Sequence, residues 1–281
     1  MSGPLPPEWT LAVVGAGNMA EALVGGFLKT GLLARERLRA ADPDPARRER
    51  FRSLFGIDVL ADSGAAVRGA QALLLAVKPQ VVPQAAAEIG PALGAGALVI
   101  SIAAGIPTAR LEALLPAGTR VVRVMPNLPA LVGAGVSAYC RGARATGEDA
   151  RRVDALLRAV GVAVPVEEAR MDAVTALSGS GPAYVFYLAE CLAQAGVALG
   201  FDPDTARQLT LGTVRGAARL LEDGDPDPAE WRRRVTSKGG TTAAAMTVLE
   251  GADMPALWKA ALRAAAGRAR ELAAPPPGEA L

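Results

Sequence analysis

Histidine is absent from the 281 residues of this sequence, and its absence excludes several kinds of chemistry. Histidine is the most common general base, the most common zinc ligand and the base of the Ser-His-Asp triad. Any reaction that this chain carries out must therefore proceed without an imidazole group.

Cysteine is scarce as well. Only Cys140 and Cys191 are present, and they are far apart in the sequence and lack the spacing of metal ligands. We expect two reduced thiols in a cytoplasmic protein, with neither a disulfide framework nor a metal site. Residues 1–10 contain no basic start followed by a hydrophobic segment, so the sequence predicts no export signal.

Long hydrophobic runs and a strong net charge are also missing. Hydrophobic residues make up 51% of the chain, but its apolar stretches, such as residues 97–106, are too short to span a bilayer. The net charge is +2, with arginines dispersed among acidic residues, so we expect no nucleic-acid-binding surface. These features favour a soluble protein that acts on a small molecule.

The order of apolar and amphipathic segments predicts two domains. From residue 10 to 165, short apolar runs alternate with amphipathic stretches, as in βαβ units with a mainly parallel sheet. Residues 166–273 contain no further β-branched runs, only Ala/Leu-rich segments broken by Gly and Pro. We predict an α/β fold with an N-terminal Rossmann-type dinucleotide-binding domain (10–165), a C-terminal all-helical dimerisation domain (166–273) and a disordered tail (274–281).

The helices of the second half are expected to pair with those of another copy. They are apolar around much of their circumference. A small helical domain cannot bury all of this apolar surface within itself, so we predict a homodimer. Their predicted starts are near Glu168, Pro182, Pro203, Pro228, Thr241 and Met254.

A glycine turn lies between a hydrophobic segment and an amphipathic one in residues 10–30. In the run GAGNMA, Gly15 permits a tight turn, Gly17 lets the backbone approach a phosphate, and Ala20 is small enough for helix and strand to pack. Free amides at the helix N-terminus would hold a pyrophosphate. The pattern alone is weak, but its flanking strand and helix favour a dinucleotide site over an ordinary turn.

The end of the second predicted strand carries signals for both nicotinamide cofactors. Asp42 stands where a carboxylate would bind the ribose 2′-hydroxyl of NAD and repel the phosphate of NADP. Arg47 and Arg48 are close enough in sequence to bind that phosphate. An Asp-Pro turn and solvated helix charges explain the same residues equally well. The choice between NADPH and NADH therefore stays open.

Three further strand ends are predicted to form the floor of the cofactor site, because ligands of open α/β sheets lie across the carboxyl ends of the strands. They are AVKPQ at residues 76–80, SIAAGI at 101–106 and RVMPNLPA at 123–130. Their Pro, Gly and small residues would let a flat nicotinamide ring lie against the backbone.

Two segments of the helical half depart from plain packing. Residues 176–186, ALSGSGPAYVF, are explained by a capped helix entry. Residues 234–250, RVTSKGGTTAAAMTVLE, favour a socket for one small anion such as a carboxylate over a mere capping loop. The socket would consist of the amides of residues 239–242 and the hydroxyls of Thr236, Ser237, Thr241 and Thr242.

Six motifs together closely resemble pyrroline-5-carboxylate reductase. They are GAGNMA, AVKPQ, SIAAGI, RVMPN, LSGSGPAYVF and VTSKGGTTAA, and they occur in the order of that family between Leu11 and about Glu250. The resemblance implies hydride transfer from NADPH or NADH to the C=N carbon of pyrroline-5-carboxylate, which gives L-proline in the last step of its synthesis. It also implies a helical homodimer, which in some members assembles into a decamer.

The resemblance further implies roles for individual residues, none of them in a metal site. The Thr241 and Thr242 amides would hold the substrate carboxylate, and the Thr242 hydroxyl, as the catalytic group, would bond the ring nitrogen. The implied substrate site comprises Ser178, Ser180, Asp225 (loosely aligned), Thr236, Ser237, Gly239, Gly240, Thr241 and Thr242. The implied NADP(H) site, with NAD(H) as an alternative, comprises Gly15, Ala16, Gly17, Asn18, Met19, Ala20, Asp42, Val77, Lys78, Pro79, Ala103, Met125, Pro126 and Asn127.

The missing histidine fits an imine substrate. A cyclic imine is partly protonated near neutral pH and accepts hydride without a strong protein acid, whereas a ketone needs a proton donor. One alternative, a β-hydroxyacid dehydrogenase, relies on a lysine in the first long helix of its second domain, and residues 180–194 contain none. Another, a sensor that binds the cofactor without turnover, is disfavoured by the intact anion socket.

Overall fold

A computed structural model describes residues 5–6, 8–222 and 227–273 of the chain. It divides into two compact units, of which the first comprises Met1–Ser180 with Ala265–Leu281 and the second Gly181–Ala264.

The first unit is built on one sheet, whose eight strands in the described residues have the order β3-β2-β1-β4-β5-β6-β7-β8. All neighbours are parallel except β6 and β7, which are antiparallel. The strand order reverses between β1 and β4, so the loops after these strands diverge and leave a crevice at their carboxyl ends. The strands are β1 (Leu11–Val14), β2 (Leu38–Ala41), β3 (Asp58–Leu60), β4 (Ala72–Leu75), β5 (Leu98–Ser101), β6 (Arg120–Met125), β7 (Gly135–Arg141) and β8 (Gly161–Pro165).

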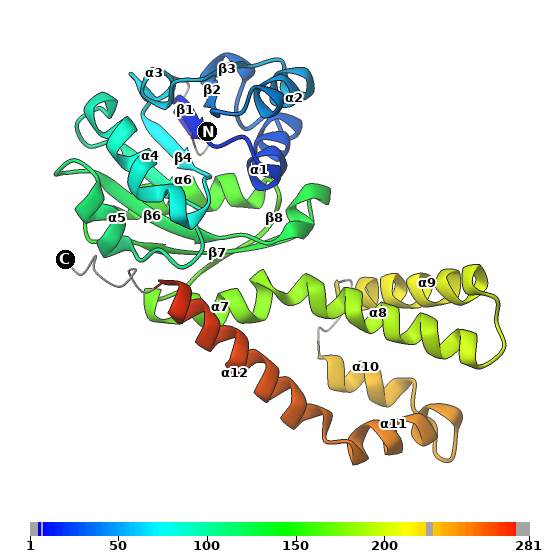
Figure 1. The fold of residues 1–281 in the computed structure, drawn as a ribbon. Helices are drawn as coiled ribbons and strands as arrows, with labels where there is room; N and C mark the ends of the chain where they lie inside the picture. Colours follow the sequence, from blue (N-terminus) through cyan, green and yellow to red (C-terminus); the bar gives the residue numbers. More distant parts are fainter. Residues whose placement is uncertain (1–4, 7, 223–226, 274–281) are drawn as a thin grey trace. The chain divides into compact units, whose positions relative to one another are not determined.

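Helices cover both faces of this sheet (Figure 1). Successive strand residues point to opposite faces, so Val13 packs with Leu23 and Phe27 of α1, whereas Val14 packs in a separate cluster with Ile89 of α4. This two-sided burial explains why β1, β4 and β5 are continuous apolar runs. The helices of the region are α1 (Asn18–Lys29), α2 (Pro45–Phe55), α3 (Ser63–Val67), α4 (Val82–Ile89), α5 (Thr108–Leu114) and α6 (Gly147–Arg158).

Residues 166–180 belong to the first compact unit. A 3-10 turn (Glu168–Arg170) leads into α7 (Met171–Val174) and then into a π-helical turn (Thr175–Gly179). Met171 is fully buried against Ala138 and Cys140 of β7, which holds the segment on the sheet. Compactness does not test which residues form the functional domains, so the predicted boundary at residue 165 stays a prediction. The predicted tail, 274–281, lies outside the described residues.

The second unit is helical, as predicted. Its helices are α8 (Gly181–Ala198), α9 (Pro203–Glu222), α10 (Pro228–Arg234), α11 (Thr241–Gly251) and the first part of α12 (Met254–Ala273). The predicted starts at Pro203, Pro228, Thr241 and Met254 are confirmed, and α8 begins one residue before the predicted Pro182. Pro in the first turn and an Asp cap account for the starts of α9 and α10, with Asp202 and Asp227 as the caps, whereas α11 is capped by Gly240.

Many large apolar side chains of the second unit are exposed within one chain. Neither α8 nor α11 contains a buried residue, and Leu199 and Val248 have exposed fractions of 81% and 71%. Apolar surface of this extent marks a protein–protein interface. Among the described residues, none of the helices has the length and hydropathy needed to cross a membrane.

Candidate active site

A cavity of about 850 Å³ lies at the carboxyl ends of the strands around the β1–β4 crevice. Such a cavity at the reversal of strand order is where doubly wound folds bind dinucleotides. Nine residues of the predicted cofactor site line it, namely Gly15, Gly17, Asn18, Met19, Asp42, Val77, Lys78, Met125 and Pro126.

The predicted glycine turn forms one wall of this cavity. The Gly15 amide donates to the carbonyl oxygen of Ala41 at 2.8 Å, and the φ of Gly15 is +99°. A Cβ on Gly15 would lie 2.6 Å from the carbonyl oxygen of Ala76, so both the backbone conformation and the space require glycine. Gly17 caps α1 without any side-chain hydrogen bond, which leaves the first amides of α1 available to a phosphate.

Asp42 braces the turn. Its side chain is buried, with Oδ2 accepting from the Ala16 amide at 2.8 Å and Oδ1 accepting from the Asp44 amide at 2.9 Å. Each carboxylate oxygen thus already has a backbone partner. Asp42 thereby joins the loop after β2 to the loop after β1, and it also lines the cavity.

The two arginines that follow have different surroundings. Arg48 donates from Nη1 to the carbonyl oxygens of Asp42 (3.0 Å) and Pro43 (2.8 Å), so its guanidinium closes the loop on itself. Arg47 lines the cavity, and its Nη1 lies 3.3 Å from the place that a Cβ on Gly17 would occupy. The sequence could not separate them, because the separation depends on how α2 sits over the glycine turn.

The remaining predicted cofactor residues do not line this cavity. Ala16, Ala20 and Ala103 are buried in the two core clusters, because neighbouring residues of a strand end or turn alternate between cavity and core. Pro79 lines a second cavity, and the Asn127 side chain is engaged elsewhere. Ile102 and Ala104, which belong to the predicted floor segment 101–106, line the cavity.

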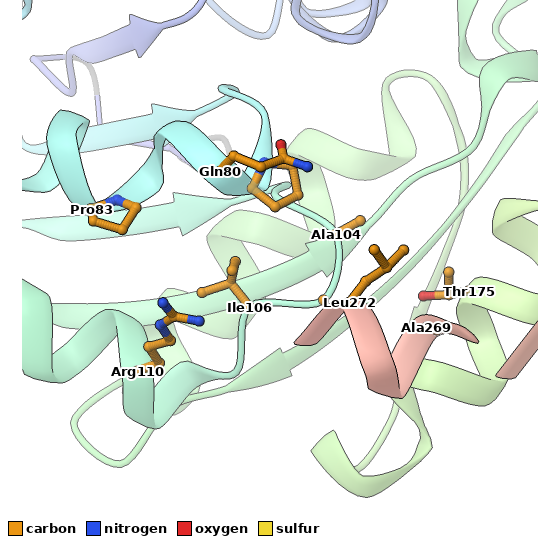
Figure 2. A pocket seen from close by; sticks show the side chains of 10 residues that line it. Gln80, Pro83, Ala104, Ile106, Arg110, Thr175, Ala269 and Leu272 are labelled. Atoms are coloured by element: carbon orange, nitrogen blue, oxygen red, sulfur yellow. The ribbon is translucent and has the colours of Figure 1, made fainter. Parts of the chain in front are cut away.

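The second cavity, of about 260 Å³, adjoins the first and shares Ala104 with it (Figure 2). Figure 2 shows the Arg110 and Gln80 side chains on one side and Leu272 on the other. Thr175, the first residue of the π-helical turn, also lines it. The sequence did not predict this cavity, because the pattern around Arg110 is that of an ordinary solvent-facing residue of a helix.

Asn127 and Ser178, which were assigned to the cofactor and the substrate, contact each other. Asn127 Nδ2 donates to the Ser178 carbonyl oxygen at 3.1 Å, and its Oδ1 accepts from the Val136 amide at 2.8 Å. The Ser178 hydroxyl donates to the carbonyl oxygen of Val174 at 3.2 Å. Both side chains are therefore engaged within the first unit.

The residues of the predicted anion socket include a turn that directly precedes α11. Gly239 has a φ of +70°, and the Gly240 amide donates to the Ser237 carbonyl oxygen at 3.1 Å. Gly240 caps α11 without a side-chain hydrogen bond, and Thr241 and Thr242 supply the first amides of the helix. Most of the residues predicted to bind an anion are thus brought to one helix N-terminus, whereas the Thr236 hydroxyl donates to the carbonyl oxygen of Arg232. Asp225 lies outside the described residues.

Cys140 is a buried thiol beside charged groups. Burial raises its pKa to about 11, and the nearby Glu168 carboxylate adds to this shift. Among the described residues, no group of three or more His, Cys, Asp or Glu side chains could hold a metal ion.

We expect Cys140 to resist alkylation in the folded protein. With a pKa of about 11, only about one thiol in a thousand is ionised at pH 8, and the thiolate is the reactive form. Native protein would be treated with iodoacetamide at pH 8 and its peptides analysed by mass spectrometry, with protein unfolded in guanidinium chloride as the control. Modification of Cys140 at the same rate in both samples would contradict its burial.

The geometry defines a dinucleotide-dependent oxidoreductase of the Rossmann class. Its glycine turn, Arg47 and the strand-end residues Ile102, Ala104, Met125 and Pro126 lie around one cavity at the carboxyl ends of a mainly parallel sheet. The family model described as "NADP oxidoreductase coenzyme F420-dependent" matches residues 10–105, and the model "Pyrroline-5-carboxylate reductase dimerisation" matches residues 168–272.

Relatives of known name extend over nearly the whole chain. The pyrroline-5-carboxylate reductase of Pseudomonas aeruginosa is 44% identical over 94% of this chain and 96% of its own length. That of Pisum sativum is 39% identical over 95% of this chain and 97% of its own length. The chain belongs to the pyrroline-5-carboxylate reductase family, whose members are NAD(P)H-dependent oxidoreductases.

Solved structures agree with this assignment. A pyrroline-5-carboxylate reductase from Coxiella burnetii, 34% identical, superimposes with a TM-score of 0.90 over 95% of this chain and all of its own. The enzyme from Plasmodium falciparum, solved with NADP bound, is 27% identical and has a TM-score of 0.82 over 95% of this chain and 98% of its own.

Proposed function

We propose that this protein reduces L-1-pyrroline-5-carboxylate to L-proline with NADPH, as the last step of proline biosynthesis. The observation that carries the proposal is 44% identity over 94% of the chain with a relative named for this reaction. The absence of histidine supports it, because a protonated imine accepts hydride without a strong acid from the protein.

The reaction itself is the first test. Purified protein would be mixed with pyrroline-5-carboxylate and either NADPH or NADH, with cofactor oxidation followed by absorbance and L-proline measured by chromatography. We expect proline to appear in step with NADPH oxidation. Cofactor binding without oxidation would favour a sensor and contradict the proposed reaction.

The cavity residues support NADPH as the cofactor. When bound, NADPH supplies the hydride, and the chain supplies its binding and orientation. The amides at the start of α1 would hold the pyrophosphate, and Arg47 would bind the 2′-phosphate. Ile102, Ala104, Met125 and Pro126 would form the floor for the nicotinamide. Asp42 accepts from two backbone amides and keeps a lone pair on each oxygen for a ribose hydroxyl, so NADH stays the alternative cofactor.

The anion socket supports binding of the substrate carboxylate. The amides of Thr241 and Thr242 would hold the carboxylate at the N-terminus of α11, and Lys238 would add positive charge beside it. The Thr242 hydroxyl would bond the ring nitrogen and so orient the C=N carbon for hydride transfer.

Thr242→Val is expected to lower kcat/KM for the imine by about 10- to 100-fold, because the hydroxyl is lost while the amide stays. The NADPH dissociation constant, measured by fluorescence titration, should change by less than about 2-fold. Thr247→Val is the matched control, since the Thr247 hydroxyl lies on the same helix and bonds its own backbone at Ala243. Equal activity of both variants would remove the assigned role of Thr242.

The exposed apolar helices support a homodimer. The model for the family's dimerisation domain covers residues 168–272, which contain most of the exposed large apolar residues. Burial of α8 and α11 against a second copy would remove that surface from water, which stabilises the dimer. Light scattering after size exclusion would distinguish a dimer from assembly of dimers into a decamer.

Two free cysteines are in keeping with a cytoplasmic location.

A further inference from the structure

A side chain just beyond the end of strand β6 hydrogen-bonds the π-helical turn Thr175–Gly179. In this turn the Ser180 amide donates to the carbonyl oxygen of Thr175, five residues back, at 2.9 Å. The carbonyl oxygen of Ser178 accepts from the Asn127 amide group, which lies 51 residues earlier in the chain. Single π turns are rare and are found frequently at functional sites.

The same turn packs against the floor of the large cavity. A Cβ on Gly179 would lie 2.5 Å from Cε of Met125. The Met125 side chain therefore packs against the turn in the space that a side chain at residue 179 would occupy. Met125 lines the large cavity and packs on its other side against the buried cluster around Met171. At its first residue, Thr175, the turn lines the second cavity. The π turn thus lines the second cavity through Thr175 and contacts a residue that lines the first.

The Asn127 side chain is held by two hydrogen bonds to the protein, one at each end of its amide group. Its exposed fraction is 7%, its Oδ1 accepts from the Val136 amide and its Nδ2 donates to Ser178. It follows Pro126, which lines the cavity, without lining the cavity itself. Asn127 therefore joins three parts of the first unit: the end of β6, strand β7 and the π turn.

We propose that Asn127 is a positioning residue, which holds the π turn against Met125 and thereby fixes the part of the cavity floor that faces the nicotinamide. This inference rests on the proposed function. Without the Asn127 donor, the Ser178 carbonyl would lose its partner, the turn would relax and Met125 would gain room to move. The dinucleotide would still be held by the glycine turn and Arg47, whereas the geometry of hydride transfer would be lost.

Asn127→Asp is the sharpest variant, because it keeps the shape and the acceptor for Val136 and replaces the donor to Ser178 with a carboxylate oxygen, which repels that carbonyl. We expect kcat to fall about 10- to 100-fold while KM for NADPH stays within about 3-fold. With NADPH that carries deuterium at both C4 positions, the isotope effect on kcat should increase, because hydride transfer becomes slower relative to other steps. A merely structural role would lower the active fraction and leave the isotope effect unchanged.

Gly179→Ala tests the position of Met125 in the cavity floor by a change in the π turn itself. Its added methyl group would displace the Met125 side chain without touching Asn127, so we expect the same combination of lower kcat, retained KM for NADPH and larger isotope effect. Wild-type protein is assayed in the same experiment, and its failure to oxidise NADPH with pyrroline-5-carboxylate would contradict the proposed function.

Hydrogen–deuterium exchange tests the attachment independently of activity. In Asn127→Asp, peptides that cover residues 171–186 should exchange faster than in wild type at a temperature at which both are folded. Unchanged exchange in this segment would overturn the proposal, as would faster exchange with unchanged kcat. A KM for NADPH raised 10-fold or more at constant kcat would also overturn it, since Asn127 would then act in binding the cofactor.

Discussion

Gly15→Ala is expected to abolish useful NADPH binding, with a dissociation constant raised by about 100-fold or more, equivalent to about 3 kcal/mol. The new Cβ would lie 2.6 Å from the carbonyl oxygen of Ala76 and 2.8 Å from its carbonyl carbon, at a φ of +99°. Both contacts are with backbone, so relief requires the β1–α1 turn to move away from the end of β4. These two segments form adjoining walls of the cofactor cavity.

Gly31→Ala is the matched control for this effect. Gly31 also has a positive φ, +69°, but an added Cβ would meet nothing within 4 Å, so only backbone strain of about 1 kcal/mol is expected. The two variants would be compared by thermal unfolding and by fluorescence titration with NADPH. Similar losses of NADPH affinity in both would show that backbone strain, and not the contact with Ala76, controls the site.

Arg47→Glu is expected to lower kcat/KM for NADPH relative to NADH by about 100-fold, equivalent to about 2.7 kcal/mol. Arg47 is the arginine at the cavity, and its replacement would put a negative charge where the 2′-phosphate is proposed to bind. NADH has no such phosphate, so its kcat/KM should change by less than about 3-fold. Steady-state kinetics with both cofactors would measure the ratio.

Arg48→Ala separates this charge effect from a change of loop structure. Arg48 bonds the carbonyl oxygens of Asp42 and Pro43 and so holds the loop that precedes α2. Its loss should weaken NADPH and NADH to a similar extent and leave the ratio between them within about 3-fold. A larger change of the ratio in Arg48→Ala than in Arg47→Glu would assign the 2′-phosphate to Arg48.

Features that depend on neighbouring residues were predictable. The strand, glycine turn and helix of residues 11–29 are contiguous, and the positive φ of Gly15 follows from the turn that such a sequence must make. The helices of the second unit begin where Pro and capping residues place them. The presence of the cofactor cavity could thus be derived from local pattern.

Roles that depend on the direction of one side chain were not predictable. Asp42, Arg47 and Arg48 were equally suited to a cofactor, and only the packing of α2 over the glycine turn turned Arg47 toward the cavity. A motif predicts that all of its residues belong to the cofactor site. At a strand end, however, alternate side chains point into the core, and Ala103 is one of these buried residues.

The sequence by itself therefore determined the order of elements, the glycine turn and a chemistry without imidazole, because each depends on residue type and on short spacing, whereas the anion socket stays a prediction. Tertiary structure decided which of the two arginines, Arg47 or Arg48, lines the cavity and why Asn127 and Ser178 meet across 51 residues. Hydrogen bonds between distant segments depend on how strands and helices pack, and packing is a property of the whole core rather than of any local pattern.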